Sequence, residues 1–313
     1  MNILVTGGAG FVGSHLIEEL VKLKANVVVA DICYDKRSYF MTAELNKKTK
    51  ALKLNVCDYN ELLRVVNKHK IEFIFHLAAQ ALVEVGYKDP KGTLDNNIVS
   101  TVNLLEISRL NKNIKGIIVA SSDKAYGKLY KGKYVETDPL SGDHPYDTSK
   151  SVTDLISSTY YKTYKIPVTI TRFGNIYGEG DLNFSRIIPG IMKSLAENKT
   201  LFIRSNGKYV RDYLYVKDVV RGYVMLAENI DKISGEAFNF GSTETLSVIE
   251  LINLVGKVLR KQIRYKIQNT AKNEIPYQSL DYSKIAKTIS WKSTYRLKNK
   301  INKIYAWYKH NTI

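Results

Sequence analysis

Short β-branched runs and amphipathic stretches follow one another along the first half of the chain. Residues 2–6 form a run of strand type, residues 11–23 carry apolar side chains at helical spacing, and residues 26–30 again favour a strand. Side chains on one face recur every two residues in a strand and about every 3.6 residues in a helix. The three segments therefore predict a strand, a helix and a second strand parallel to the first.

This alternation continues to about residue 172. Further strands are predicted at 51–54, 73–77, 116–120 and 168–172, and further helices at 59–68, 97–111 and 148–164. Nearly continuous apolar runs indicate strands that are buried on both faces, as in a parallel sheet covered by helices. The predicted fold class is α/β, a Rossmann-type doubly wound parallel sheet that binds ligands at the carboxyl ends of its strands.

The pattern becomes irregular from about Gly174 onward. We expect a Rossmann domain over residues 1–173, which also receives part of 212–240, and a smaller C-terminal α/β cap over residues 174–313. No internal repeat or long linker interrupts the chain, so the two parts should pack tightly against each other.

Composition and charge narrow the function classes. Of the 313 residues, 44% are hydrophobic and 25% are charged, as in ordinary globular proteins. A formal net charge of +17 attracts polyanions, but the lysines are scattered and no arginine-rich recognition helix occurs. We therefore expect no nucleic-acid partner, and an anionic small molecule as substrate instead.

Neither a membrane nor a metal ion is expected as a partner. No apolar run approaches the roughly 18 residues of a membrane span, and the first residues lack the basic and apolar regions of a signal peptide. Cys33, Cys57 and the five histidines show no metal-ligand spacing. The sequence predicts a cytoplasmic protein without a metal site.

A glycine-rich turn joins the first predicted strand to the first helix. Gly7, Gly10 and Gly13 are spaced three residues apart, with Phe11 and Val12 at the start of the helix. Such glycines allow a tight turn and a close approach of a pyrophosphate, whose charge is met by the amides of the helix N-terminus. This motif in this context predicts a dinucleotide site.

Asp31 ends the second predicted strand. A carboxylate there accepts hydrogen bonds from a ribose 2′-hydroxyl and repels a 2′-phosphate, which favours NAD over NADP. Lys36 and Arg37 argue in the other direction, because a basic residue accommodates that phosphate.

Tyr146 and Lys150 are four residues apart, so a helix that begins near Tyr146 places them on one face. An ammonium group near a phenol favours the phenolate and is expected to lower the pKa of Tyr146. Ser121 and Ser122 end a predicted strand between the glycine turn and this pair. Together these residues suit the removal of a hydroxyl proton while hydride leaves the same carbon.

These motifs identify a resemblance over almost the whole chain to the extended short-chain dehydrogenase/reductase family, in its branch of nucleotide-sugar epimerases and dehydratases. Besides the glycine turn and Tyr146-x-x-x-Lys150, the matching segments are residues 76–80, Asn97, 121–127, 172–178, 211–216, Asp281-x-Ser283-Lys284 and Trp291. In this family helices such as those at 97–111 and 148–164 pair across a two-fold axis, which implies a homodimer.

The resemblance implies roles for individual residues. Tyr146 is the base, Lys150 binds the nicotinamide ribose, Ser122 bonds the sugar hydroxyl that is oxidised, and Asp58 meets the adenine. The implied NAD-binding set is Gly7, Gly10, Phe11, Val12, Gly13, Asp31, Asp58, Leu77, Ala78, Ala79, Asn97, Tyr146 and Lys150. The implied set for the sugar nucleotide is Gln80, Ser122, Asn175, Arg186, Arg204 and Arg211, with arginines as partners of phosphate.

Asp123 and Lys124 bear on the reaction. Epimerases of this branch usually carry small, unreactive residues there, whereas a 4,6-dehydratase needs an acid for the C6 hydroxyl and a base for the C5 proton. Asp123 suits the acid, and Lys124 suits the base if desolvation lowers its pKa. With residues 76–80 and the pair Ile203-Arg204, this site most resembles CDP-glucose 4,6-dehydratases.

Several functions remain open at this point. The best guess is a 4,6-dehydratase in the synthesis of surface polysaccharide sugars, such as those of capsule or lipopolysaccharide. The alternatives are a 4-dehydrogenase on a GDP-linked heptose or hexose, a 4-epimerase, and a non-catalytic NAD-binding scaffold, against which the intact Ser122, Tyr146 and Lys150 argue. Ser100 replaces a usual glycine and a lysine-rich loop follows Gly127, so the nucleobase and the sugar stay open.

Overall fold

The computed structural model describes residues 1–128, 132–270 and 275–311, so part of the lysine-rich loop lies outside the described residues. A parallel sheet of seven strands forms its centre, in the order β10-β6-β5-β4-β1-β2-β3. The strands are β1 (Asn2–Thr6), β2 (Asn26–Asp31), β3 (Lys50–Lys53), β4 (Phe73–His76), β5 (Gly116–Ala120), β6 (Val168–Phe173) and β10 (Ala237–Phe240). This confirms the predicted fold class.

Alternate side chains of each strand enter two different cores, one on each face of the sheet. In β1, Ile3 and Val5 pack towards α1 (Phe11–Lys22) and α8 (Val216–Glu228), whereas Leu4 packs towards the opposite face. That opposite face is covered by α3 (Tyr59–Lys68), α5 (Pro90–Leu110) and α6 (Pro145–Tyr164). Helices on both faces explain why the strands are almost continuously apolar in sequence.

Two helices begin earlier than the sequence pattern predicted. The expected start of α5 at residue 97 is wrong, because Asp89 caps the helix by accepting a hydrogen bond from the Gly92 amide at 2.9 Å, with Pro90 in the first helical position. Helix α6 begins at Pro145, earlier than the apolar pattern over 148–164 predicted and close to Tyr146, where the spacing of Tyr146 and Lys150 placed its start. Tyr146 and Lys150 therefore both lie inside the helix.

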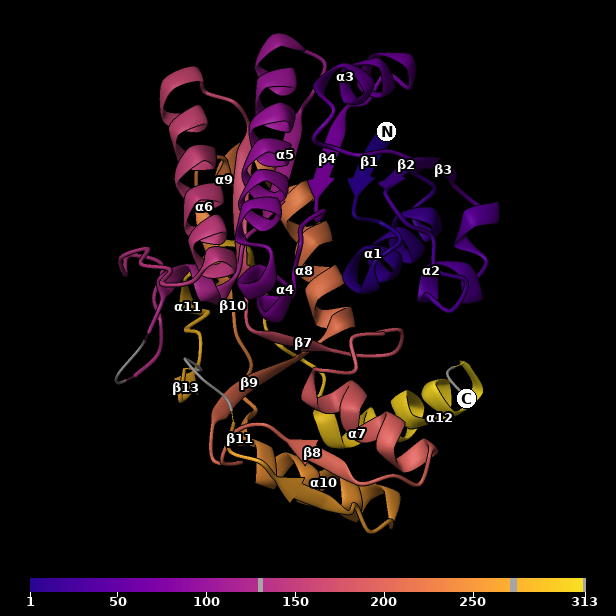
Figure 1. The fold of residues 1–313 in the computed structure, drawn as a ribbon. Helices are drawn as coiled ribbons and strands as arrows, with labels where there is room; N and C mark the ends of the chain where they lie inside the picture. Colours follow the sequence, from indigo (N-terminus) through magenta and orange to yellow (C-terminus); the bar gives the residue numbers. More distant parts are fainter. Residues whose placement is uncertain (129–131, 271–274, 312–313) are drawn as a thin grey trace.

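The second half of the chain forms separate, smaller sheets beyond the carboxyl ends of β1 and β4 (Figure 1). Strand β9 (Val210–Tyr215) pairs with β7 (Asn175–Tyr177), β11 (Thr245–Ser247) and β13 (Tyr277–Gln278), while β8 (Leu201–Ile203) pairs with β12 (Tyr265–Ile267). Helices α7 (Ile187–Ala196), α10 (Val248–Leu259) and α12 (Ile301–Asn311) share a core with these strands.

Shorter elements complete the described chain. They are α2 (Tyr39–Thr42), α4 (Val83–Lys88), α9 (Ile230–Ile233), α11 (Ser283–Ile289) and the 3₁₀ turns η1 (Leu45–Lys47), η2 (Asp123–Tyr126) and η3 (Leu297–Asn299). The chain returns to the large sheet through α8 and β10, so part of segment 212–240 belongs to it. Within the described ranges, no helix combines the length and apolar character needed to cross a membrane.

Candidate active site

The glycine turn between β1 and α1 is closely packed from two sides. Gly7 has a φ of +67°, and a Cβ atom there would lie 2.7 Å from the backbone of Ala78, just beyond β4. A Cβ atom at Gly13 would lie 2.5 Å from the carbonyl oxygen of Gly7. Any larger residue at either position would force the turn open, so these glycines are structurally required.

The start of α1 faces outward from this packed turn. Gly10 is exposed, Phe11 and Val12 are half-buried, and no side chain in the described part of the protein caps the helix. The first amides of a helix have no partner within it, so they are available to an anion. The turn therefore fits the pyrophosphate of a dinucleotide.

Asp31 at the end of β2 helps to hold the same turn. Its Oδ2 accepts a hydrogen bond from the Ala9 amide at 3.0 Å, and burial raises the pKa of its carboxyl group. Arg37, which argued for NADP, is bound to Asp35 at 2.8 Å on the surface. The arginine is thus already paired, which supports the expected preference for NAD.

Three predicted catalytic residues meet between β5 and α6. Lys150 is buried, donates a hydrogen bond from Nζ to the Ala120 carbonyl at 2.7 Å, and lies 6.0 Å from the ring centroid of Tyr146. Ser122 lies near enough to Tyr146 to oppose the rise in the pKa of its phenol. The structure therefore brings together the serine, the tyrosine and the lysine that the sequence places in three separate segments.

The predicted lowering of the Tyr146 pKa by Lys150 is wrong. Burial raises the pKa of Tyr146 to about 12, against the opposing effects of Ser122 and of the positive charge of Arg186. Burial also lowers the pKa of Lys150 to about 8. Desolvation penalises the charged form of both groups and is the largest influence on the pKa of each.

Asp123 follows Ser122 and is almost fully enclosed. Its Oδ1 accepts a hydrogen bond from Ser122 Oγ at 3.0 Å, and its Oδ2 accepts one from Gln278 Nε2 at 3.1 Å. Burial raises the pKa of the Asp123 carboxyl group, which suits a group that has to donate a proton near neutral pH. Lys124, the predicted base, is only half-buried.

Some predicted ligand-binding residues have structural partners of their own. Asn97 Oδ1 accepts a hydrogen bond from the Gln80 amide at 2.7 Å, and its Nδ2 donates to Ser149 Oγ at 2.9 Å. Gln80 Nε2 donates to Thr93 Oγ1 at 2.9 Å. Asn97 and Gln80 thus stabilise the loop after β4, which contains Leu77, Ala78 and Ala79.

Asp58 also has a local function, since its Oδ1 caps α3 by accepting a hydrogen bond from the Glu61 amide at 2.9 Å. Its contact with adenine remains a prediction. The second oxygen of this carboxylate takes no part in the cap, so the two functions are compatible.

Four of the predicted sugar-nucleotide residues come from the second half of the chain. The positive charges of Arg211 on β9 and of Arg186 oppose the burial that raises the pKa of Asp123 and of Tyr146, so both guanidinium groups act on predicted catalytic residues. Arg186 also pairs with Asp181 at 3.1 Å. Arg204, after β8, forms an ion pair with Glu84 of α4 across the two halves, and Asn175 is exposed at the start of β7.

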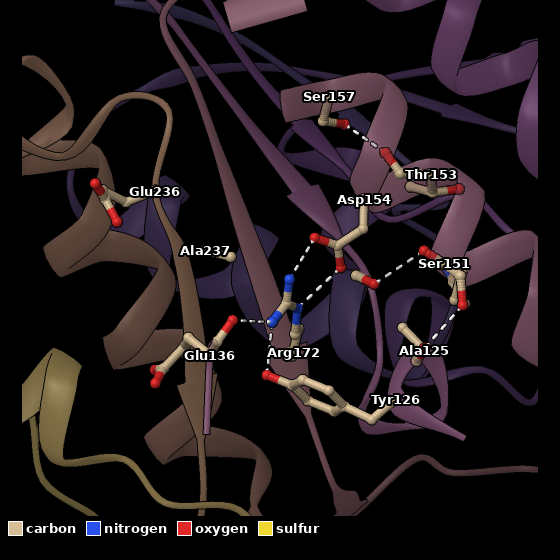
Figure 2. A network of polar contacts seen from close by, with 12 residues as sticks. Ala125, Tyr126, Glu136, Ser151, Thr153, Asp154, Ser157, Arg172, Glu236 and Ala237 are labelled. Atoms are coloured by element: carbon tan, nitrogen blue, oxygen red, sulfur yellow. Dashed lines mark hydrogen bonds and ion pairs between the residues drawn. The ribbon is translucent and has the colours of Figure 1, made fainter. Parts of the chain in front are cut away.

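A buried ion pair that the sequence did not predict joins β6 to α6 (Figure 2). Arg172 on β6 donates hydrogen bonds to both carboxylate oxygens of Asp154 on α6, at 2.9 and 2.7 Å. The same guanidinium donates to the hydroxyl oxygen of Tyr126 at 2.6 Å, and Gln278 is a second contact that the sequence did not predict. Helical spacing already placed Asp154 on one face with Lys150, but nothing in the pattern marked Gln278.

Comparisons with known proteins cover the whole chain. A family model described as GDP-mannose 4,6 dehydratase matches residues 4–304. The CDP-glucose 4,6-dehydratase of Salmonella typhimurium is 29% identical over 98% of this chain and 90% of that protein, and the dTDP-glucose 4,6-dehydratase of the same species is 28% identical over 100% and 94%. The crystal structure of Bacillus cereus UDP-glucuronic acid 4-epimerase, in complex with UDP-glucuronic acid and NAD, has a TM-score of 0.91 at 27% identity over 99% of both chains.

Proposed function

The chain belongs to the GDP-mannose 4,6-dehydratase family, and we propose that it is an NAD-dependent enzyme that converts a nucleotide-diphosphate sugar into its 4-keto-6-deoxy product. The resemblance to nucleotide-sugar epimerases and dehydratases of the extended short-chain dehydrogenase type is confirmed. One observation carries the choice of a dehydratase. A buried carboxyl group, Asp123, accepts a hydrogen bond from Ser122 at 3.0 Å, beside the proposed base Tyr146.

The glycine turn, Asp31 and Lys150 would hold NAD. The exposed and uncapped start of α1 supports a pyrophosphate site, and the paired Arg37 supports a cofactor without a 2′-phosphate. NAD, when bound, would supply the hydride chemistry, as acceptor from C4 of the sugar and as donor to C6. All other steps fall to side chains of the protein.

Oxidation begins at the C4 hydroxyl group. Tyr146 takes its proton while Ser122 bonds the same oxygen, and hydride leaves C4. Because burial raises the pKa of Tyr146 to about 12, the phenolate needs additional positive charge, which Arg186 partly provides. Lys150 is held close to the Tyr146 ring by its bond to the Ala120 carbonyl.

Elimination of water follows from the 4-ketone. Lys124 takes the C5 proton, the electron pair forms the C5–C6 double bond, and Asp123 protonates the departing C6 hydroxyl group. Asp123 has then lost one proton and Tyr146 has gained one. Ser122, which is hydrogen-bonded to Asp123 and lies beside Tyr146, would relay the proton from Tyr146 to Asp123, so each turnover ends with both groups restored.

Anionic substrates suit the positive charges at the mouth of this site. Arg186, Arg204 and Arg211 would bind the diphosphate and Asn175 the sugar nucleotide, as the resemblance implies. A product of this kind would serve the synthesis of surface polysaccharide sugars.

A 4-epimerase is the second candidate, because the UDP-glucuronic acid 4-epimerase has the same fold over the whole chain. Release of the 4-keto sugar by a 4-dehydrogenase is the third.

Mass spectrometry of reactions with CDP-glucose, dTDP-glucose, UDP-glucose and GDP-mannose tests this proposal. We expect one of these sugars to lose the mass of a water molecule. Loss of two hydrogen atoms would indicate a 4-dehydrogenase, and an unchanged mass with an altered sugar NMR spectrum would indicate an epimerase.

Asp31→Ala is expected to weaken NAD binding about tenfold, because a carboxylate that bonds the ribose is removed. The same variant should bind NADP better than the wild type does, since the repulsion of the 2′-phosphate is lost. Titration with both cofactors measures this. Glu44→Gln is the control, because it alters only an exposed pair with Lys47, and a wild type that prefers NADP would contradict the prediction.

A homodimer formed by α5 and α6 is also part of the proposal. These helices lie side by side (Figure 1) and expose the large apolar side chains of Val99, Leu110, Leu155 and Tyr164. Light scattering should give a dimer for the wild type and a monomer for Leu155→Glu. Phe202→Glu, an equally exposed position on β8, should leave the dimer intact, and a monomeric wild type at micromolar concentration would refute the prediction.

A further inference from the structure

Gln278 reaches from the second half of the chain to the proposed acid, Asp123. It lies on β13, is only 2% exposed, and donates a hydrogen bond from Nε2 to Asp123 Oδ2 at 3.1 Å. Ser122 Oγ donates to the other carboxyl oxygen, Oδ1, at 3.0 Å. Each oxygen of this buried carboxyl group therefore accepts a hydrogen bond from a different donor.

The backbone around Gln278 is held by bonds that do not involve its side chain. The Val210 amide on β9 donates to the Pro276 carbonyl at 2.9 Å. Asp212 Oδ2, also on β9, accepts a hydrogen bond from the Leu280 amide at 2.8 Å. The chain is thus fixed to β9 on both sides of Gln278, so a change of its side chain should leave the backbone in place.

Packing alone does not explain a glutamine at this position. An amide taken out of water costs free energy unless it is hydrogen-bonded, whereas methionine, which has a similar length, would fill the space without that cost. The group that the Gln278 amide contacts is the carboxyl group that has to release a proton during elimination. The contact with Asp123 therefore accounts for the buried amide.

The two donors make the oxygens of Asp123 chemically different. An amide N–H group can only donate, so Gln278 Nε2 favours Oδ2 as the accepting C=O oxygen of the protonated acid. A serine hydroxyl group both donates and accepts, so Oδ1 can carry a proton beside Ser122. The acid proton is thus directed to Oδ1, the oxygen that Ser122 contacts.

Resting on the proposed dehydratase function, we propose that Gln278 is a positioning residue that keeps the acid proton of Asp123 on Oδ1. This proton passes to the C6 hydroxyl group as the C6–O bond breaks and water leaves. Lys124 takes the C5 proton and returns it once hydride has reached C6. The proton that Tyr146 took from the C4 hydroxyl group returns through Ser122 to the same Oδ1. Gln278 neither gains nor loses a proton, so atoms and charges balance.

Four charged or titratable groups surround the Asp123 carboxyl group besides the amide. Burial is the largest influence and raises the pKa of Asp123, while the positive charges of Lys124 and of Arg211 on β9 oppose this rise. Tyr146 and Asp147 face it from α6. A hydrogen-bond donor to a carboxylate also favours the ionised form, so loss of the amide should raise this pKa further.

Single-turnover kinetics of Gln278→Met test this function. The absorbance of bound NADH rises as C4 is oxidised and decays as hydride passes to C6 after elimination. With the sugar that the wild type dehydrates, and at the pH where each enzyme decays fastest, the rise should be unchanged. The decay should slow about three- to tenfold, the factor that one hydrogen bond contributes.

The pH profile of the decay gives a readout that a merely structural function would not move. Elimination needs a protonated acid, so the decay slows as pH rises through the pKa of Asp123. Gln278→Met removes a donor to the carboxylate and should move this limb to higher pH. Gln278→Glu should move it further, because two carboxyl groups at one site share a proton.

Gln262→Met is the matched control, since it makes the same substitution at an exposed glutamine in the same half of the chain, and it should behave as the wild type. Thermal unfolding and NAD titration check that each variant is folded. A Gln278→Met enzyme with the decay rate and pH profile of the wild type overturns the proposal for Gln278 alone, as does one whose rise and decay slow equally. A wild type whose product loses no water overturns the dehydratase function and this inference together.

Discussion

Tyr146→Phe is expected to lower turnover about a hundred- to ten-thousand-fold, the usual contribution of a general base. Only the hydroxyl group is removed, and in the protein this group interacts with Ser122 rather than with the core. Fold and NAD affinity should therefore survive. Turnover is measured by product formation, and NAD affinity by titration.

A second variant distinguishes loss of the base from loss of cofactor binding. Lys150→Met should reduce both the rate and the affinity for NAD, because Lys150 is proposed to bind the nicotinamide ribose and lies 6.0 Å from the ring centroid of Tyr146. A Tyr146→Phe enzyme with turnover near that of the wild type would show that the assignment of the active site is wrong, whatever the other residues do.

The sheet was predictable because its signal is local. Strands buried on both faces are apolar at nearly every position, as Ile3, Leu4 and Val5 show by entering two different cores. The start of α5 was missed because its first turn is polar, and only the capping pair Asp89-Pro90 marks it. Strand β10 joins the sheet only because the chain returns to it from the smaller sheets. The spacing of apolar residues along the sequence does not show this return.

The catalytic residues were predictable as types and spacings, but their electrostatics were not. Tyr146 and Lys150 are four positions apart, which places them on one helix face, yet burial is the largest influence on the pKa of each group. The contact of Gln278 with Asp123 joins residues 155 positions apart. No local pattern in the sequence identifies such a pair.

The division into a domain over residues 1–173 and a cap over 174–313 stays a prediction, as do the ligand contacts of the individual site residues. Two positively charged side chains nevertheless indicate where the diphosphate of the substrate would bind. Arg211 and Arg186 act from the second half of the chain on Asp123 and Tyr146. A diphosphate bound by them would place its sugar over Ser122.

Asp123→Asn is expected to separate oxidation from elimination. The amide keeps the shape of the side chain, so the hydrogen bond with Ser122 can be retained, but it has no proton of suitable acidity for the departing C6 hydroxyl group. Oxidation at C4 needs only Tyr146, Ser122 and Lys150. A dehydratase with this substitution should therefore accumulate bound NADH together with a 4-keto sugar that keeps its oxygen at C6.

Absorbance of the bound cofactor and mass spectrometry of the released sugar measure the two products of Asp123→Asn. Overall turnover should fall about a hundred- to ten-thousand-fold, as for loss of a general acid, while the first oxidation stays within a few-fold of the wild type. Gln278→Leu is a matched comparison, because it removes the other hydrogen bond to Asp123 and leaves the carboxyl group in place. A 4-dehydrogenase or an epimerase would be little affected by Asp123→Asn, since neither reaction expels the C6 hydroxyl group. Normal dehydration by the Asp123→Asn enzyme would instead show that the proton of the departing water comes from another residue.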